Sequence, residues 1–204
     1  MKTYHKINSL WKRDRNNPKI VLFDEVCTDE FRALYNCPWN CYEKVDGTNI
    51  RIIVKDGKPE FRGKTDRAQI PGPLVAALVE QFPDEKFKDF ADMCVYGEGY
   101  GPKINGGGKY RDTPGFVGFD VKVGDVWLDK TNVRNILDKL DAKMVPYLGE
   151  MTVPQAVDLV KSGLTSKWGD FEAEGLVATP VGDFLDRQGR RIITKIKASH
   201  FNAR

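Results

Sequence analysis

Residues 42–62 constrain the fold more than any other part of this 204-residue sequence. In YEKVDGTNIRII, an aromatic entry and a β-branched exit flank Gly47-Thr48-Asn49, which predicts a strand, a tight turn and a second strand. Residues 51–55 then meet residues 58–62 across Asp56-Gly57, which is a hairpin signature. The segment therefore predicts a sheet of short strands, with a lysine, Lys44, near the end of one of them.

Lys44 is a candidate nucleophile because of this position. A lysine ammonium that is partly desolvated among other cations loses basicity, and the free amine is nucleophilic. Gly47 has no side chain, so a phosphate-bearing ligand can approach the backbone closely. On its own, one K-x-D-G stretch is better explained as a surface hairpin with an ordinary Asp-Gly turn. The interpretation therefore depends on the rest of the chain.

Composition bounds the size and the partners of the protein. With 204 residues, of which 41% are hydrophobic, the chain can bury one substantial core, and we expect one domain. Lys and Arg number 32 against 29 Asp and Glu, which gives a net charge of +3. A basic face for nucleic acid is therefore possible only if the charges segregate.

The cysteines and the apolar runs bear on metal binding and location. The cysteines lack a paired C-x-x-C spacing, and the chain has two histidines. This pattern argues against a zinc site and favours reduced structural thiols. The sequence shows neither a signal peptide nor an apolar run of bilayer length, so we expect a soluble, cytoplasmic protein.

Periodicity predicts the remaining elements. Apolar residues at helical spacing and candidate caps predict helices over residues 28–34, 73–82, 84–93, 129–140 and 152–164. Apolar runs bounded by turn residues predict strands over residues 20–23, 95–101, 116–123, 126–128, 172–180 and 190–197. Residues 1–20 are expected to form an irregular basic lead-in, and residues 102–115 a mobile surface loop.

Several strands carry residues that packing alone does not explain. Glu98 lies amid glycines in YGEGYG, which indicates that something approaches that backbone closely. Glu174 likewise enters an apolar strand through a glycine. Lys195 and Lys197 project from one strand face about 7 Å apart, and they repel unless water or an anion such as a polyphosphate lies between them. Phe119 is either a core residue, which one strand alone favours, or a base-stacking platform.

Five short motifs occur in an order that resembles a known superfamily. These are KVDGTN, YGEGYG, FVGFDV, EGLVATP and KIK. Together they resemble motifs I, III, IIIa, IV and V of the lysine-adenylating nucleotidyltransferases, which include DNA ligases, RNA ligases and mRNA capping enzymes. Because the lysine motif ends in GTN, the sequence is most similar to the phage RNA ligase 2 group. The resemblance covers residues 5–197.

The resemblance implies a catalytic set. Lys44 resembles the nucleophile that takes AMP from ATP, and Asn49 the motif I asparagine that assists strand joining. Glu174 resembles the acid tied to the catalytic metal, Mg²⁺ or Mn²⁺. Lys195 and Lys197 resemble the motif V lysines that contact the phosphates.

The resemblance also implies nucleotide contacts. Glu98 resembles the acid that contacts the ribose of the nucleotide, and Phe119 the aromatic that stacks on adenine. Glu43, which precedes the nucleophile, is a further candidate for nucleotide binding.

Exposed cations are expected to hold the nucleic acid. After motif I, relatives tend to read G-R-T where this chain has Gly63-Lys64-Thr65, so the arginine is replaced by Lys64 or displaced to Arg62. The candidates for strand contacts are Arg62, Lys64, Arg67, Lys103, Lys109 and Arg111.

The resemblance implies an α+β nucleotidyltransferase fold, ATP-grasp-like, with two antiparallel-rich β-sheets, flanking helices and ATP between the sheets. Residues 1–204 would form a single adenylyltransferase domain with no OB-fold or other C-terminal domain. The implied function is an ATP-dependent polynucleotide ligase, an RNA ligase joining 5′-phosphate and 3′-hydroxyl ends, acting as a monomer in a cytoplasm that a phage-encoded protein would share with its host. A minimal DNA nick ligase and a non-catalytic nucleotide- or RNA-binding module are the alternatives.

Overall fold

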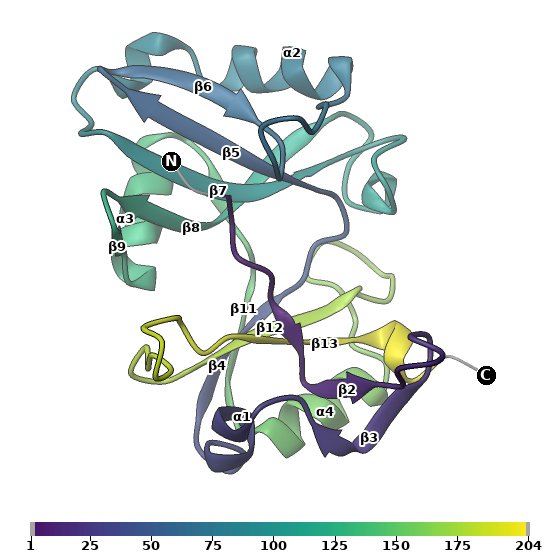
Figure 1. Ribbon diagram of the computed structural model, residues 1–204. Helices are drawn as coiled ribbons and strands as arrows, with labels where there is room; N and C mark the ends of the chain where they lie inside the picture. The colour runs from purple at the N-terminus through teal and green to yellow at the C-terminus, as the bar shows by residue number, and fades with distance from the viewer. Residues whose placement is uncertain (1–2, 203–204) are drawn as a thin grey trace. The chain divides into compact units, whose positions relative to one another are not determined.

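The structure, a computed structural model, describes residues 3–202, and the chain divides into two compact units (Figure 1). Unit 1 contains the N-terminal residues up to His5 together with Val45–Val145. Unit 2 contains Lys6–Lys44 and the residues from Pro146 onward. Each unit has its own β-sheet and its own hydrophobic core. The single-domain expectation stays a prediction.

The sheet of unit 1 has the order β10-β8-β7-β5-β6, with β9 paired to β8. Every pair is antiparallel except β10 with β8. The predicted hairpin at Asp56-Gly57 is confirmed, because both residues have positive φ values, 49° and 69°, as a two-residue turn requires. The strands are β5 (Thr48–Lys55), β6 (Lys58–Arg62), β7 (Met93–Tyr100), β8 (Gly115–Val123), β9 (Val126–Trp127) and β10 (Lys143–Met144).

Two α-helices and two short 3₁₀ helices belong to the described part of unit 1, namely α2 (Gly72–Gln81), η1 (Asp84–Phe87), η2 (Gly107–Lys109) and α3 (Lys130–Lys139). Asp129 caps α3 by accepting a hydrogen bond from the Asn132 amide. The prediction of a helix over residues 84–93 is wrong beyond η1. The chain leaves the helical path once Phe87 is buried, and β7 already begins at Met93.

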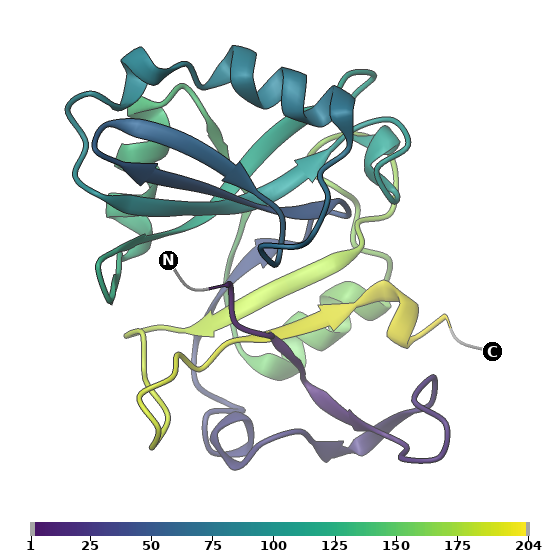
Figure 2. The ribbon, with the colours of Figure 1, turned by 45° about the horizontal axis from the view of Figure 1, so that its top comes forward.

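The two faces of the unit 1 sheet differ in character. On β5, Ile50, Ile52 and Val54 project into the core, where α2 and α3 add apolar side chains. Figure 2 shows α2 lying over this sheet. Since side chains alternate along a strand, Asn49 and Arg51 project from the opposite face, together with their register partners Glu98 and Tyr96 on β7. We call this second side the polar face of unit 1.

The sheet of unit 2 has the order β1-β13-β12-β4-β11, and only β1 and β13 are parallel among the pairs of residues 3–202. A separate pair of strands, β2 and β3, joins the same unit. The strands are β1 (Asn8–Ser9), β2 (Trp11–Arg13), β3 (Val21–Val26), β4 (Trp39–Glu43), β11 (Tyr147–Met151), β12 (Gly175–Pro180) and β13 (Thr194–Lys197). The two antiparallel-rich sheets predicted from the sequence are thus confirmed.

The helices of unit 2 begin where their caps predict. Thr28 caps α1 (Asp29–Ala33), and Thr152 forms a capping box with Gln155 at the start of α4 (Val153–Lys161). A 3₁₀ helix, η3 (Ala198–His200), follows β13. None of the helices formed by residues 3–202 has the length and the apolar character needed to cross a membrane.

Two expectations about the chain path are corrected. The lead-in is a packed element rather than an irregular one, since Leu10 and Trp11 are buried in the core of unit 2 and β1 extends its sheet. Residues 42–53 do not form a local hairpin, because β4 pairs with β11 and β12 whereas β5 pairs with β6 and β7. Lys44 is therefore the last residue of a unit 2 segment, directly before the chain enters unit 1.

Candidate active site

Three charged side chains meet at the ends of neighbouring strands in unit 2. Lys44 follows β4, Glu174 precedes β12 and Lys197 ends β13. The Lys44 Nζ atom lies 2.7 Å from one carboxylate oxygen of Glu174, and the Lys197 Nζ atom lies 2.6 Å from the other. Glu174 thus holds two ammonium groups at once, and we call Lys44, Glu174 and Lys197 the charged cluster.

Gly175 makes this cluster possible. Its φ of 143° is in a range that L side chains rarely adopt, and a Cβ atom there would lie 2.1 Å from the Ile196 carbonyl oxygen. Its own carbonyl accepts a hydrogen bond from the Lys44 amide at 2.9 Å. The acid-glycine pattern of this strand therefore serves to bring Glu174 against both lysines. Lys195 lies two residues before Lys197 on the same half-buried side of β13, as predicted.

Glu43 has a structural environment. Its side chain is buried, and its two carboxylate oxygens accept hydrogen bonds from the Ser166 hydroxyl at 2.5 Å and from the Lys167 amide at 2.8 Å. Ser166 also accepts a hydrogen bond from the Trp168 amide. Glu43 is therefore suited to fixing the residue next to Lys44 and the loop after Leu164. The sequence had no signal for Ser166.

His200 supports the same region from η3. Its Nδ1 atom accepts a hydrogen bond from the Lys197 amide, so the ring stays next to the charged cluster. Burial, helped by the positive charges of Arg13, Lys197 and Lys195, lowers the pKa of His200 to about 4. The ring is therefore neutral at physiological pH.

The polar face of unit 1 carries Asn49 and Glu98, which are direct register partners on β5 and β7. Among residues 3–202, the buried Oδ1 atom of Asn49 has no hydrogen-bond partner. Since buried polar atoms are nearly always satisfied, this acceptor is suited to a donor from a bound molecule.

The glycines around these residues serve the protein itself, which corrects the expectation that a ligand approaches them. A Cβ atom on Gly47 would lie 2.2 Å from the Gly99 carbonyl oxygen, and one on Gly97 would lie 2.3 Å from the Phe116 ring. A Cβ atom on Gly99 would lie 2.5 Å from Leu74. The glycines are needed for close packing of backbone and core, and they leave no space for a phosphate.

Phe119 is the extra residue of a β-bulge. Tyr96 pairs with Asp120 and Gly97 pairs with Gly118, so Phe119 has no partner on β7. It is half-buried, lies outside the apolar core cluster and contacts the Tyr4 ring at 5.1 Å between centroids. Bulges commonly re-aim a side chain beside a functional site. This favours the stacking interpretation over the core interpretation.

A buried network supports the bulge. Asp120 is 1% exposed and accepts hydrogen bonds from the Tyr4 hydroxyl at 2.5 Å and from Lys130 Nζ at 2.8 Å. Lys130 also donates to the Phe119 carbonyl at 2.6 Å. Sequence reasoning missed these three residues, because none of them stands out from ordinary surface charges in the sequence.

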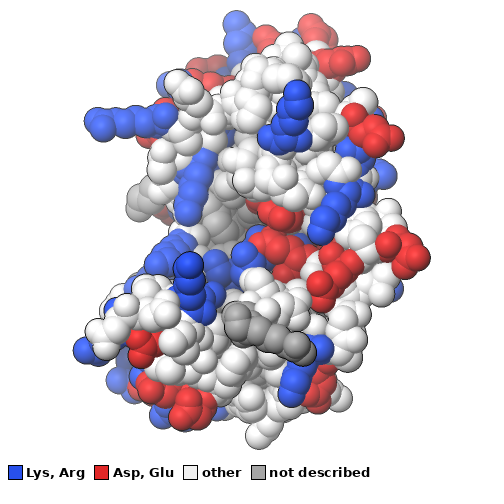
Figure 3. All heavy atoms as spheres, turned by 90° about the vertical axis from the view of Figure 1, so that its right-hand side faces the viewer, with Lys and Arg blue, Asp and Glu red and all other residues white. Residues whose placement is uncertain are grey.

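The predicted nucleic-acid contacts all lie in unit 1 and are exposed. Arg62 ends β6 and pairs with Glu60, while the other five lie in the loop after β6 and in the loop between β7 and β8. That second loop is packed rather than detached, since Ile104 is buried and Tyr110 accepts a hydrogen bond from the Asp46 amide. Figure 3 shows Lys and Arg side chains interspersed with Asp and Glu side chains on the face drawn.

The metal-binding capacity of the described residues is small. Within residues 3–202, no three His, Cys, Asp or Glu side chains are grouped so that they could hold a metal ion. Glu174 by itself offers one carboxylate. Mg²⁺ and Mn²⁺ sites that act on nucleotides typically use one or two carboxylates, with phosphate and water oxygens completing the coordination. Glu174 therefore fits a metal ion that arrives with a nucleotide, and no resident site is formed.

Comparisons with known proteins agree with this geometry. A family model described as RNA ligase matches residues 38–197. A mutant of Naegleria gruberi RNA ligase solved with ATP and Mn has a TM-score of 0.67 and 16% identity, over 84% of this chain and 52% of that one. A second mutant with ATP and Mn has a TM-score of 0.70 and 16% identity, over 97% and 56% of the two chains. No curated protein matches the sequence. The chain thus spans little more than half the length of these structures, and at this identity they establish the fold.

Proposed function

Since this chain belongs to the RNA ligase family, we propose that it is an ATP-dependent RNA ligase that joins 5′-phosphate and 3′-hydroxyl ends through an adenylated lysine. The observation that supports this most strongly is the charged cluster, in which Lys44 lies between the carboxylate of Glu174 and the end of a strand bearing two further lysines. The Naegleria structures with ATP or AMP and Mn support the choice of nucleotide and metal.

The first step is transfer of AMP to Lys44. The Nζ atom attacks the α-phosphorus of ATP, a nitrogen–phosphorus bond forms, and the bond from that phosphorus to the bridging oxygen breaks. Pyrophosphate leaves with the electron pair. The amine must lose a proton to attack, and the Glu174 oxygen at 2.7 Å is placed to accept it.

Lys195 and Lys197 stabilise the charge that develops on the phosphate oxygens. Lys197 is already held by Glu174, and the alternation of β13 places Lys195 on the same side. A Mg²⁺ or Mn²⁺ ion held by Glu174 and the phosphates would add Lewis-acid stabilisation.

Unit 1 supplies the nucleoside contacts in this proposal. Phe119, presented by its bulge, stacks on adenine, and Glu98 accepts hydrogen bonds from the ribose hydroxyls. The unsatisfied Oδ1 of Asn49 is suited to accept a hydrogen bond from the 3′-hydroxyl that attacks in the last step. Glu43 is a positioning residue rather than a nucleotide contact.

In the later steps, AMP passes from Lys44 to the 5′-phosphate, and the 3′-hydroxyl then displaces AMP to form the phosphodiester. The exposed cations of unit 1 would hold the strand. Because one chain supplies the whole charged cluster, we propose a monomer, working in the cytoplasm where ATP and RNA occur.

Mass spectrometry of the protein after incubation with ATP and Mg²⁺ tests the proposal. We expect an added mass of one AMP on Lys44 in the wild type and none in Lys44→Ala. Folded wild-type protein that forms no adduct, after removal of any AMP acquired during expression, would overturn the enzyme in favour of a binding module. Nicked duplexes with RNA or DNA on the 3′-hydroxyl side then decide between an RNA ligase and a DNA nick ligase.

A further inference from the structure

Arg51 is a fully buried arginine on the polar face of unit 1. Its side chain is 0% exposed, although it projects away from the apolar core that Ile50 and Ile52 enter. A buried guanidinium is costly unless its N–H groups are paired. The residues that cover and pair it therefore determine whether this arrangement is stable.

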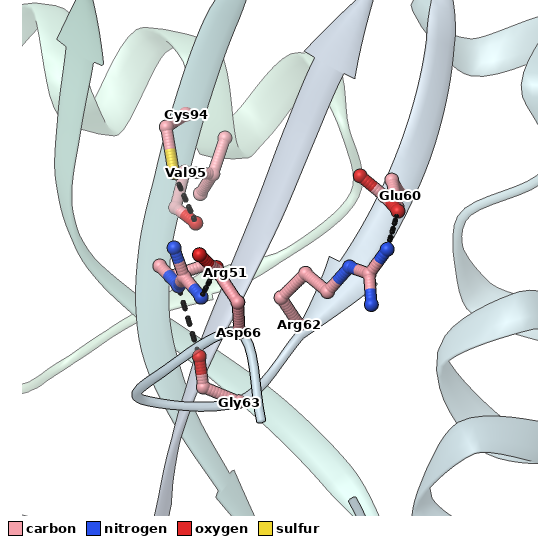
Figure 4. Close-up of polar contacts among 7 residues, drawn as sticks. All are labelled: Arg51, Glu60, Arg62, Gly63, Asp66, Cys94 and Val95. Atoms are coloured by element: carbon pink, nitrogen blue, oxygen red, sulfur yellow. Dashed lines mark hydrogen bonds and ion pairs between the residues drawn. The ribbon is translucent and has the colours of Figure 1, made fainter. Parts of the chain in front are cut away.

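The covering residues belong to the loop after β6. Arg51 Nε donates to the Gly63 carbonyl at 2.9 Å, and Nη2 donates to Asp66 Oδ1 at 2.7 Å (Figure 4). Within the described part of the chain, the buried Nη1 atom has no partner. The guanidinium thus depends on this one loop for its polar contacts.

The loop itself has few other anchors. Gly63 is buried, but residues 64–68 are exposed, and the Ala68 amide donates to the Thr65 carbonyl to close a turn. The Asp66 side chain is 78% exposed, although its carboxylate reaches inward to Arg51. The hydrogen bond and the charge of Arg51 hold the pKa of Asp66 below its usual range, so the carboxylate stays ionised.

Lys64 and Arg67 flank Asp66 in this loop, and both are candidate contacts to the nucleic-acid backbone. A cation on a free loop must be ordered when it binds a phosphate, which reduces affinity. A cation on a loop fastened at two points has less freedom to lose. Arg62, by contrast, lies on β6 and pairs with Glu60, independently of Arg51 (Figure 4).

We propose that Arg51 and Asp66 are positioning residues that fasten the loop over residues 63–68, so that Lys64 and Arg67 bind the backbone of the RNA strand. The inference rests on the proposed function. Neither residue touches the reacting atoms in this account, and their effect is on strand binding.

Asp66→Ala is the decisive variant because two explanations predict opposite signs. Asp66 is an anion beside two candidate phosphate contacts, so removing a charge that merely repels the strand would strengthen binding. Removing a positioning residue weakens it. Since Asp66 is exposed, the change opens no cavity, and the fold is expected to persist.

The measurement is binding of a fluorescein-labelled, 5′-phosphorylated nicked RNA duplex over a salt series without ATP. Each lost phosphate contact reduces the slope of log affinity against log salt by about 0.7–0.9, so loss of both reduces it by about 1.4–1.8. We expect this reduction in Asp66→Ala and in Arg51→Met. Lys64→Gln, which lowers the slope in the wild type, should have little further effect in Asp66→Ala, because the contact is already lost.

Asp125→Ala is the matched control. Asp125 is an exposed carboxylate of the same unit that pairs with Lys122, in the turn between β8 and β9. Its removal changes the net charge equally and should leave the slope unchanged. The inference is wrong if Asp66→Ala keeps the wild-type slope, or if it binds the duplex more tightly. The proposed function fails separately, if wild-type Lys44 forms no adenylate.

Discussion

The charged cluster of unit 2 and the polar face of unit 1 treat their buried polar groups in opposite ways. In the cluster, both oxygens of Glu174 are paired with ammonium groups, so the charges hold one another in place. On the polar face, Asn49 Oδ1 has no partner among the described residues, and Phe119 lies outside the core. A paired cluster is organised before a ligand arrives, whereas an unsatisfied acceptor and an uncovered ring are completed by one.

Glu174→Gln tests the cluster and has the largest expected effect. The neutral amide cannot accept the proton of Lys44, and it leaves Lys44 and Lys197 as neighbouring cations. We expect the rate of lysyl-AMP formation to fall about 10²–10³-fold, the range seen when one preorganised electrostatic group is lost. Glu172→Gln removes an exposed carboxylate two residues away and should retain the wild-type rate. Equal rates in the two variants would show that pairing in the cluster is irrelevant to the chemistry.

The pH dependence of stability is the second test of unit 2. The unfolded chain binds a proton on His200 near pH 6.5, but the folded chain does so only near pH 4, so acid favours unfolding across this window. The loss between these values amounts to up to about 3 kcal/mol, and it ends below pH 4. Urea unfolding of the wild type and of His200→Asn between pH 4 and 7 measures it. The variant should show the shallower pH dependence, and identical profiles would contradict the assignment.

Phe119→Ala tests the polar face. If Phe119 stacks on adenine, the substitution weakens ATP binding by about 1–3 kcal/mol and changes the melting temperature little. Phe116→Ala, three residues earlier on β8 but buried in the core, should instead lower the free energy of unfolding by about 3–5 kcal/mol. Calorimetric titration with ATP and thermal melts separate the two. A sharp drop in melting temperature for Phe119→Ala would restore the core interpretation.

Salt should distinguish the two regions with the smallest effect for each contact. Self-adenylation needs only ATP and metal, whereas end joining also needs strand contacts from the exposed cations of unit 1. Doubling the salt concentration should weaken strand binding roughly 1.6–1.9-fold for each phosphate contact. Both activities can be measured over one salt series. A parallel decline would show that the strand is not the salt-sensitive partner.

Local patterns in the sequence predicted most elements and the charged cluster. Capping residues predicted the starts of α1 and α4, and Asp56-Gly57 predicted the β5–β6 hairpin, because these signals act between residues close in the chain. Lys44, Glu174 and Lys197 were identified from short motifs, and the strand order of unit 2 places them together. The alternation of β13 was likewise readable from one segment.

Only the tertiary structure decided what each polar residue and glycine contacts. Arg51 was indistinguishable from a solvated strand residue until the loop over residues 63–68 was seen to cover it. Gly47 and Gly97 were interpreted as room for a ligand, although backbone and core atoms more than fifteen residues away occupy that space. The bulge at Phe119 depends on the register between β7 and β8, and its support depends on Tyr4 from the other end of the unit. These features arise from contacts between distant segments, and a local sequence pattern carries no information about which distant residue will fill a given space.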